Sequence, residues 1–289
     1  MTKKLIIFYD SIQSPLQTKR ELLGTLAKDC KIFNLGSVRL CDGRRVRLIE
    51  DTILEYQGKG YDITGLIWNG TEIGCGMMRR IFIKHNVKFA YAEQGIMPQN
   101  ENLRFMAKCM HWSTAQSSFL KGVGDVYSKP KMLSTVVNVI CQLPYDSSMS
   151  RLVDPINDFQ NEVLEFLEHH SDPSKIDIVV CKHPKALIED YLNFEELIPK
   201  VKSFRYKSTS TPTAEQCEGL DLVLGWNSTV LLELAANGRN CFALDADSYT
   251  SIVNHEDSKT IKEMVENYQF SPRATEAGEI LSTLSKYTG

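Results

Sequence analysis

Runs of β-branched and aliphatic residues alternate along this chain with amphipathic segments of helical length. In the N-terminal half, the expected strands are residues 4–9, 30–35, 62–68 and 87–92. The expected helices between them are residues 15–29, 44–58 and 74–85. Because a parallel strand pair needs a crossover connection, usually a helix, this alternation predicts an α/β fold with parallel sheets.

The same alternation restarts near residue 135, after a Gly-, Ser- and Lys-Pro-containing crossing at residues 107–135. The later strands are expected within residues 135–144, 175–184, 200–206, 220–225 and 240–244, with helices at residues 154–170 and from Ser228. We therefore expect two Rossmann-like domains facing a central cleft. They are residues 1–130 and 131–270, followed by a C-terminal helix at residues 271–289. Ligands of open α/β sheets bind at the carboxyl ends of strands, so the loops there are the candidate sites.

The composition is that of a globular protein without a membrane-spanning segment. The 289 residues, 43% hydrophobic and 24% charged, can bury the cores of two ordinary domains. No apolar run approaches the roughly 20 residues that span a bilayer, and the first residues lack the features of a signal peptide. A cytoplasmic protein is therefore expected. The glycine motifs of P-loop kinases and of dinucleotide enzymes are absent, which argues against both classes.

The cysteines are spread along the chain, with no close pair at the spacing of metal ligands. Several lie in apolar, strand-like runs, where a reduced thiol behaves as a small hydrophobic side chain. We expect all eight to be structural: Cys30, Cys41, Cys75, Cys109, Cys141, Cys181, Cys217 and Cys241.

The stretch LGWNSTVLLELAANGRNCFAL, residues 224–244, passes from an expected strand into a helix. Asn227, Ser228 and Thr229 supply cap-type side chains where that helix should begin. A helix start offers free N–H groups and a partial positive charge, and the two hydroxyls add to a site that suits a phosphate. Glu233, about one turn further on, can reach a ribose hydroxyl. The alternative is an ordinary N-cap with an exposed glutamate.

The run VVCKHPKAL has the same layout, because Lys182 and His183 follow an apolar strand and Pro184 stands early in a probable helix. These two side chains can contact a phosphate by charge and hydrogen bonding. A single histidine is more often structural. Two phosphate-suited loops in the same half of the chain, however, together favour a nucleotide site.

Two carboxylates are placed where a reaction could use them. Asp146 follows the first strand of the second half, and Glu93 follows the last clear strand of the first half. One carboxylate from each side of a cleft could serve as nucleophile and as acid/base. Taken singly, each is more often a cap or turn residue.

The order of the motifs WNG, AEQG, CQLPYDSSM, CKHP and NSTVLLELAANGRNCFAL resembles that of the capsule and lipopolysaccharide Kdo transferases. The likeness covers roughly residues 63–250. It implies a GT-B glycosyltransferase whose C-terminal domain holds a nucleotide-sugar and whose N-terminal domain holds the acceptor. By the same resemblance, Asp146 matches the family's catalytic aspartate, proposed as the nucleophile of a retaining double displacement, and Glu93 matches the acidic residue of its E-x-G turn.

The donor-side residues are carried over in the same way. Lys182 and His183 match the family's HP loop, and Ser228, Thr229 and Glu233 match its donor phosphate and ribose region. The segment ELAANGRN departs from the family's E-A-L-x-x-G-K-P, which leaves both a CMP-linked and a UDP-linked donor open. The resemblance implies no metal and no further cofactor.

Charge distribution bears on the acceptor. Residues 1–150 carry 20 Lys and Arg against 13 Asp and Glu (+7), whereas residues 151–289 carry 13 against 23 (−10). A basic N-terminal half favours a polyanionic acceptor. The candidate contacts are Arg44, Arg45, Arg47, Arg79 and Arg80. The alternative is a solvated helical face.

Two kinds of polyanion stay open: hydroxymethylated DNA, as viral sugar transferases modify, or a bacterial capsule or lipopolysaccharide glycan. In the viral case the protein would work in the host cytoplasm. A rival class is a non-catalytic nucleotide-sugar binding module or an epimerase-like GT-B relative, which would keep the loops at His183 and Ser228.

Overall fold

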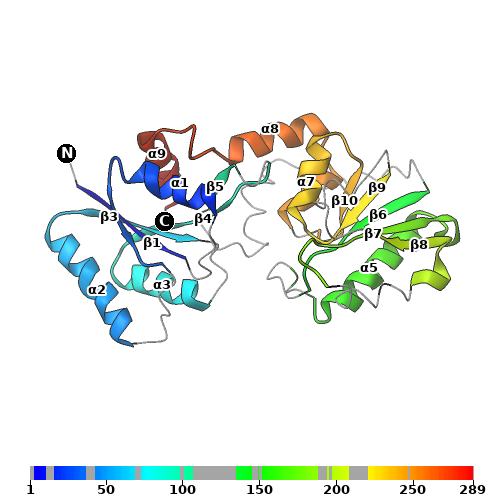
Figure 1. The fold of residues 1–289 in the computed structure, drawn as a ribbon, viewed down its shortest axis with the longest axis horizontal. Helices are drawn as coiled ribbons and strands as arrows, with labels where there is room; N and C mark the ends of the chain where they lie inside the picture. Colours follow the sequence, from blue (N-terminus) through cyan, green and yellow to red (C-terminus); the bar gives the residue numbers. More distant parts are fainter. Residues whose placement is uncertain are drawn as a thin grey trace. The chain divides into compact units, whose positions relative to one another are not determined.

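The structure, a computed structural model, describes residues 3–10, 16–36, 43–68, 73–97, 101–106, 135–144, 149, 152–187, 194, 197–207, 221–246 and 248–288. Its internal contacts divide the chain into two units. The first unit comprises Met1–Thr114 and Val265–Gly289, and the second comprises Ala115–Met264. Each unit is a sheet covered by helices (Figure 1).

The first unit holds a five-stranded sheet in the order β2-β1-β3-β4-β5. Its strands are β1 (Lys4–Tyr9), β2 (Lys31–Asn34), β3 (Asp62–Trp68), β4 (Lys88–Gln94) and β5 (Leu103–Met106). The first four are parallel, as expected from the sequence, whereas β5 runs antiparallel to β4. The antiparallel edge was not expected.

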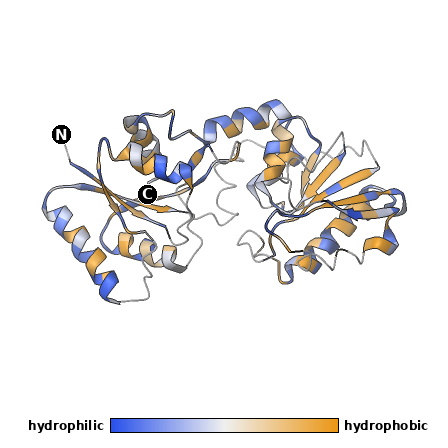
Figure 2. Cartoon of the chain, viewed as in Figure 1, coloured by the Kyte–Doolittle hydropathy of each residue, from blue (hydrophilic) through white to orange (hydrophobic). Residues whose placement is uncertain are grey.

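Two layers of helices cover this sheet. On one face, α1 (Gln17–Leu26) and α9 (Ala277–Tyr287) share a core with β1 and β3. On the other face lie α2 (Gly43–Gly58) and α3 (Ile73–Lys84). Gly65 in β3 allows α3 to approach, because a Cβ there would lie 2.4 Å from the Phe82 ring. Figure 2 shows the strands as the apolar layer between these helices.

The C-terminal segment belongs to the first unit, so the division differs from the boundaries expected at residues 130 and 270. Phe270 pairs with Leu103 of β5, each backbone N–H donating to the other's carbonyl at 2.8 Å. The side chains of Ile280 and Leu284 on α9 pack into the sheet core. The boundary between the units falls within α8 (Ser258–Tyr268).

The second unit holds a fully parallel sheet in the order β10-β9-β6-β7-β8. Its strands are β6 (Val136–Ile140), β7 (Asp177–Cys181), β8 (Ser203–Tyr206), β9 (Leu222–Gly225) and β10 (Cys241–Ala243). The helices include α5 (Pro155–His170), α7 (Thr229–Ala236) and the 3₁₀ segments η2 (Pro173–Lys175) and η4 (Tyr249–Asn254). The predicted α/β class with two Rossmann-like domains is confirmed.

Local sequence signals explain the helix limits. The Asp154 side chain accepts the Asn157 N–H at 3.3 Å, and Pro155 takes the first helical position of α5. At the far end of α7, Gly238 has a φ of 80°. The Arg239 N–H then donates to the Leu234 carbonyl at 3.0 Å, which is the Schellman ending that an Asn-Gly pair favours.

An amide side chain protects the edge strand β10. Asn254 of η4 accepts the Ala243 N–H at 2.8 Å and donates to the Ala243 carbonyl at 2.9 Å. It thereby replaces the neighbouring strand that β10 lacks on this side. Across the residues that the structure describes, we find no helix with the length and hydropathy to cross a membrane.

Candidate functional site

In the second sheet, the order in which the chain adds strands reverses between β6 and β9. From β6 it crosses through α5 to β7 on one side, whereas β9 pairs with β6 on the other side. The carboxyl ends of β6 and β9 therefore form a topological switch point. In open α/β sheets this is where the loops part and a ligand finds room.

A chain of hydrogen-bonded side chains lies across this switch point. After β6, Gln142 donates its side-chain N–H to Asn227 Oδ1 at 3.0 Å and accepts the Asn227 backbone N–H at 3.1 Å. Asn227, which is 0% exposed, donates in turn to Asp245 Oδ2 at 2.9 Å. The network fixes the loops after β6, β9 and β10 to one another, and so fixes where α7 begins.

The first turn of α7 follows directly from this network. Ser228 is the N-cap, and its Oγ accepts the Val230 N–H at 3.3 Å. The ordinary capping role is therefore present, and the Ser228 hydroxyl hydrogen can still donate to a ligand. Thr229 opens the helix as expected, and both side chains are partly exposed. The structure thus brings Asn227, Ser228 and Thr229 together at a positive helix end.

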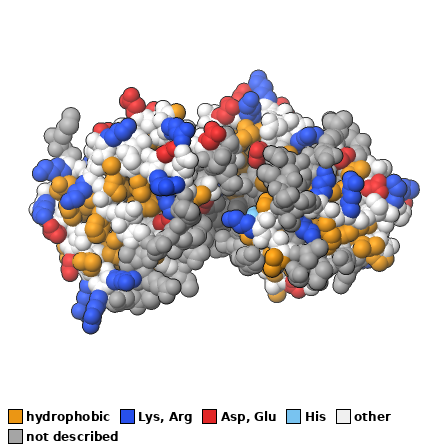
Figure 3. Space-filling view, in the orientation of Figure 1, with side chains coloured by type: hydrophobic (Ala, Val, Ile, Leu, Met, Phe, Trp, Pro, Cys, Tyr) orange, Lys and Arg blue, Asp and Glu red, His pale blue; other side chains and the backbone are white. Residues whose placement is uncertain are grey.

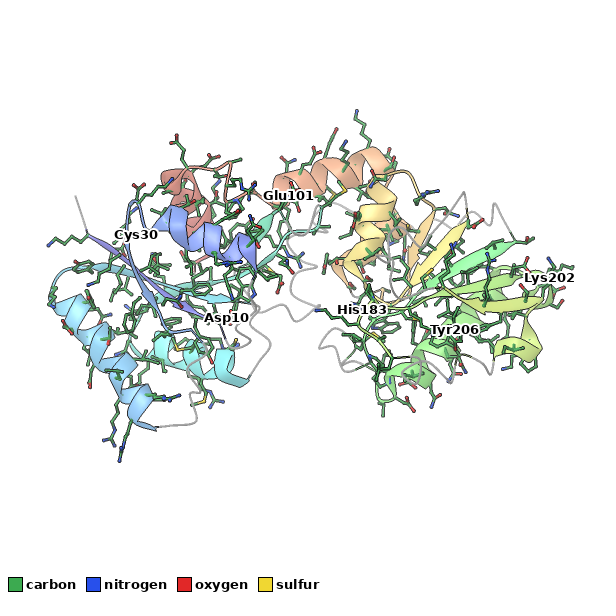
Figure 4. The ribbon with its side chains drawn as sticks, viewed as in Figure 1. Asp10, Cys30, Glu101, His183, Lys202 and Tyr206 are labelled. Carbon is green, nitrogen blue, oxygen red and sulfur yellow. The ribbon has the colours of Figure 1, made fainter. Side chains whose placement is uncertain are left out.

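Lys182 and His183 lie at the carboxyl end of β7, on the other side of β6. Lys182 is only 4% exposed, and its ammonium stands 4.1 Å from the centroid of the Tyr206 ring at the end of β8. Figure 4 labels His183 and Tyr206 in this region. The two predicted loops are therefore not adjacent, because β6, the strand that precedes Gln142, lies between β7 and β9.

The orientation of His183 is set by its own loop. Its Nδ1 accepts the Lys185 backbone N–H at 3.2 Å. This hydrogen bond assigns the proton of the neutral ring to Nε2, which makes Nε2 a hydrogen-bond donor. A phosphate oxygen is a suitable acceptor for such a donor.

Glu233 lies one turn into α7 and is half-buried. Burial raises the pKa of this carboxyl above its ordinary value, because the charged form loses solvation. A hydroxyl that donates to the carboxylate would offset that cost. This environment fits the expected role of Glu233 toward a ribose.

The described cysteines, Cys30, Cys75, Cys141, Cys181 and Cys241, are free thiols. Burial raises the pKa of Cys141 far above its ordinary value, although Lys182 acts in the opposite direction. Burial likewise raises the pKa of Cys30 to about 11. Both thiols are therefore protonated at neutral pH and poor nucleophiles. Cys41, Cys109 and Cys217 lie outside the described residues.

Glu93 is not beyond its strand, as the sequence suggested, but inside β4. Pairing with β5 extends the ladder, and Glu93 faces Arg104 across it. The half-buried Glu93 also accepts the Gln94 N–H at 3.1 Å. Gly95 ends the strand where a Cβ would lie 2.5 Å from Asn102, so the E-x-G turn has a structural requirement for glycine.

The remaining predicted residues divide into two groups. Asp146 lies outside the described residues; Pro144 before it and the buried Met149 after it are described. Arg44, Arg45 and Arg47 lie exposed at the start of α2, whereas Arg79 and Arg80 lie exposed on α3.

The arginines of α2 lie at its N-terminal end, where the helix dipole is positive and disfavours cations. Its first turn carries no acidic residue, although the positive end of a helix favours anions. Figure 3 shows Lys and Arg side chains gathered toward this end of α2. A bound anion would stabilise such an arrangement, because it would face both the helix end and the guanidinium groups.

The sequence interpretation missed several residues of the candidate site. Asp245 and Tyr206 were not singled out, and Gln142 was noted only as part of a motif. Gln142 and Asp245 each follow a strand and Tyr206 ends one, and this position is the signal that could have identified them. Trp226, 8% exposed and next to Asn227, buries its indole N–H without a hydrogen-bond partner among the residues that the structure describes. Within the described part of the chain, no group of three or more His, Cys, Asp or Glu side chains is arranged to hold a metal ion.

Comparison with known proteins extends these observations. No protein-family model matches the sequence, and no curated protein sequence matches it. Among solved structures, the β-Kdo 2,7-transferase KpsC of Thermosulfurimonas dismutans aligns over 98% of this chain and 99% of its own, with a TM-score of 0.55 and 15% identity. The chain has the fold of a β-Kdo transferase. The resemblance first given by the motifs is thereby confirmed at the level of the fold.

Two further solved structures align with lower scores than the β-Kdo transferase. The UDP-GlcNAc 2-epimerase of Neisseria meningitidis bound to UDP-GlcNAc covers 98% of this chain and 100% of its own, at 10% identity and a TM-score of 0.42. The MnaA–UDP structure from S. aureus covers 99% of this chain and 96% of its own, at 10% identity and a TM-score of 0.37.

Proposed function

We propose that the protein is a nucleotide-sugar-dependent glycosyltransferase that binds its donor through the second unit. The observation that supports this most strongly is the Gln142–Asn227–Asp245 network at the switch point of the parallel sheet. The network fixes the N-terminal end of α7 beside the carboxyl ends of β6 and β9, and α/β sheets bind ligands at such strand ends. The β-Kdo transferase fold agrees with this function.

In the proposed complex, the donor phosphates contact the start of α7, with Ser228 and Thr229 donating hydrogen bonds. Lys182 and His183 supply charge and a second donor from the carboxyl end of β7. Glu233 accepts from the ribose. The Lys182 ammonium and the positive end of α7 offset the charge of the leaving phosphate without a metal ion, and the donor is a CMP-linked or UDP-linked sugar.

The proposed reaction retains configuration through two displacements. The Asp146 carboxylate attacks the anomeric carbon, the bond from that carbon to the phosphate oxygen breaks, and the nucleotide leaves with the electron pair. The acceptor hydroxyl then attacks the same carbon and displaces Asp146, while Glu93 takes the hydroxyl proton. Two inversions restore the donor's configuration. These roles rest on the motif resemblance.

The proposed acceptor is polyanionic, either hydroxymethylated DNA or an anionic bacterial glycan. It is supported by the excess of Lys and Arg in residues 1–150 and by the exposed arginines of α2. Product analysis tests the activity as a whole. A transferase yields a glycosylated acceptor, an epimerase-like relative yields an isomerised sugar or free nucleotide without transfer, and a binding module leaves the donor unchanged.

Charge reversal tests the acceptor surface. We expect Arg44→Glu and Arg45→Glu together to weaken binding of hydroxymethylated duplex DNA or of a phosphorylated glycolipid, and to flatten the salt dependence of binding. Each lost phosphate contact removes about one unit from the slope of log K against log salt for duplex DNA. Binding and transfer are measured on both acceptors across a salt series.

Lys200→Glu is the matched control, because Lys200 is an exposed cation of the second unit. It should leave the slope and the transfer rate unchanged. If binding and transfer change with neither salt nor the arginine substitutions for both acceptors, the acceptor is neutral and the basic face is only solvated surface.

A further inference from the structure

The first sheet has a switch point of its own, and the described residues there form a second polar cluster. The chain leaves β1 through α1 to β2 on one side, whereas β3 pairs with β1 on the other. Asp10 follows β1, and Trp68 ends β3. This position is equivalent to the one that carries the candidate nucleotide site in the second sheet.

A buried ion pair ties the first turn of α1 to this switch point. Asp10, 2% exposed, accepts from the ammonium of Lys19, which is itself buried (Figure 4 labels Asp10). The same ammonium stands 5.9 Å from the centroid of a ring of Trp68. The pair has no net charge, yet it brings a strong acceptor and a strong donor together at the end of β1.

Thr18, the neighbour of Lys19, has a hydroxyl with no hydrogen-bond partner in the described part of the chain. Its Oγ1 is buried without a hydrogen bond, and the residue is 1% exposed. Thr18 belongs to the buried row of α1 that continues through Leu22 and Leu26, so it faces the sheet. Because side chains of a helix lean toward its N-terminus, the hydroxyl points toward the carboxyl ends of β1 and β3.

Among the described residues, no side chain caps the start of α1. Its N-cap residue is Leu16, which makes no side-chain hydrogen bond to the first turn. An uncapped helix start keeps its partial positive charge and its need for an acceptor. An unsatisfied hydroxyl and an uncapped helix end at one switch point both reduce stability, and such local costs are typical of functional sites.

We infer that this cluster binds a hydroxyl group of a neutral sugar. A sugar hydroxyl both donates and accepts, so it can satisfy Thr18 and the first turn of α1 while it meets the Asp10–Lys19 pair. A phosphate would stand close to the Asp10 carboxylate, whose charge Lys19 only balances, so an anion is disfavoured. Asp10, Thr18 and Lys19 are buried in the structure. Binding therefore requires the first turn of α1 to move away from the sheet.

This binding does not depend on the nucleotide site. Identifying the sugar as part of the glycosyl acceptor rests on the proposed function, and makes the acceptor a glycan rather than DNA. The two can fail separately, because sugar binding is measured in the absence of nucleotide and nucleotide binding in the absence of sugar.

The Thr18→Val substitution removes the hydroxyl and preserves the side-chain shape. We expect it to weaken binding of a neutral monosaccharide about fivefold or more, the effect of one lost hydrogen bond. The melting temperature should stay the same or rise, because an unsatisfied buried hydroxyl disappears. Ligand-observed NMR on the full chain measures the affinity, with glucose, N-acetylglucosamine and ribose as probes and inorganic phosphate as the competing class.

Thr25→Val is the matched control on the same helix. The Thr25 hydroxyl donates to the Pro272 carbonyl at 3.1 Å, so its loss should lower the melting temperature and leave sugar binding unchanged. Nucleotide affinity should be unchanged in both variants. The inference fails if none of the three sugars binds the wild type, if Thr18→Val binds them as well as the wild type does, or if phosphate binds there in their place.

Discussion

Replacing Asp146 with alanine is expected to lower sugar transfer by about 10³-fold or more, because the substitution removes the proposed nucleophile of the first displacement. Nucleotide affinity and the melting temperature should stay close to the wild-type values, since the residues that we propose to hold the donor phosphates are unchanged. The transfer rate is measured with labelled donor, and nucleotide affinity by titration calorimetry on the same protein samples.

Two further variants serve as controls for the Asp146→Ala variant. Glu168→Ala, which removes an exposed carboxylate on α5 of the same unit, should leave the rate unchanged. Asp146→Asn should be as inactive as the alanine variant, because an amide has the same shape but is not a nucleophile. Wild-type rates in Asp146→Ala would end the assignment, and inversion at the transferred sugar would exclude the double displacement.

Replacing Asn227 with alanine is expected to lower the free energy of unfolding by roughly 2–4 kcal/mol. The side chain is fully buried and joins Gln142 to Asp245, so its loss removes two hydrogen bonds and leaves polar groups at the switch point with fewer partners. One of those groups is a carboxylate, for which a lost hydrogen bond costs more than for a neutral group. Urea unfolding of the full chain measures the change.

Asn237→Ala is the control at the other end of the same helix. Asn237 is exposed and donates to the Glu233 carbonyl at 2.8 Å, so its loss should cost less than about 1 kcal/mol. Equal effects of the two substitutions would mean that the Asn227 network does not hold the site together.

Periodicity predicted the parallel strands and their helices because each strand is an apolar run bounded by polar or glycine-containing turns. The short antiparallel β5 was missed, since four residues carry too little pattern to separate a strand from a loop. That omission also misplaced Glu93, which lies inside β4 because β5 extends its ladder. The docking of α9 on the first sheet could not be predicted, because its apolar stripe does not say which core it covers.

The candidate site was predictable in part for a related reason. Ser228 could be found because it follows an apolar strand and precedes a helix start, and His183 because it follows an apolar strand; the described residues 184–187 after His183 form a turn and coil, not the helix start that Pro184 suggested. The partnership of Gln142 with Asn227 could not be found, because 85 residues separate them and only the strand order brings β6 beside β9. The same holds for Lys182 and Tyr206, which meet because β8 lies next to β7.

The central claim is that the carboxyl ends of β7 and β9 hold a nucleotide. Titration calorimetry with CMP, UDP and ADP on wild type, His183→Ala and Ser228→Ala tests it most directly, with His169→Ala, an exposed histidine of α5, as the control. At least one nucleotide should bind the wild type and the control equally. Each site substitution should weaken that binding about tenfold, the loss of one hydrogen bond to a charged phosphate. Unchanged affinity in both site variants would contradict the claim and place the nucleotide elsewhere.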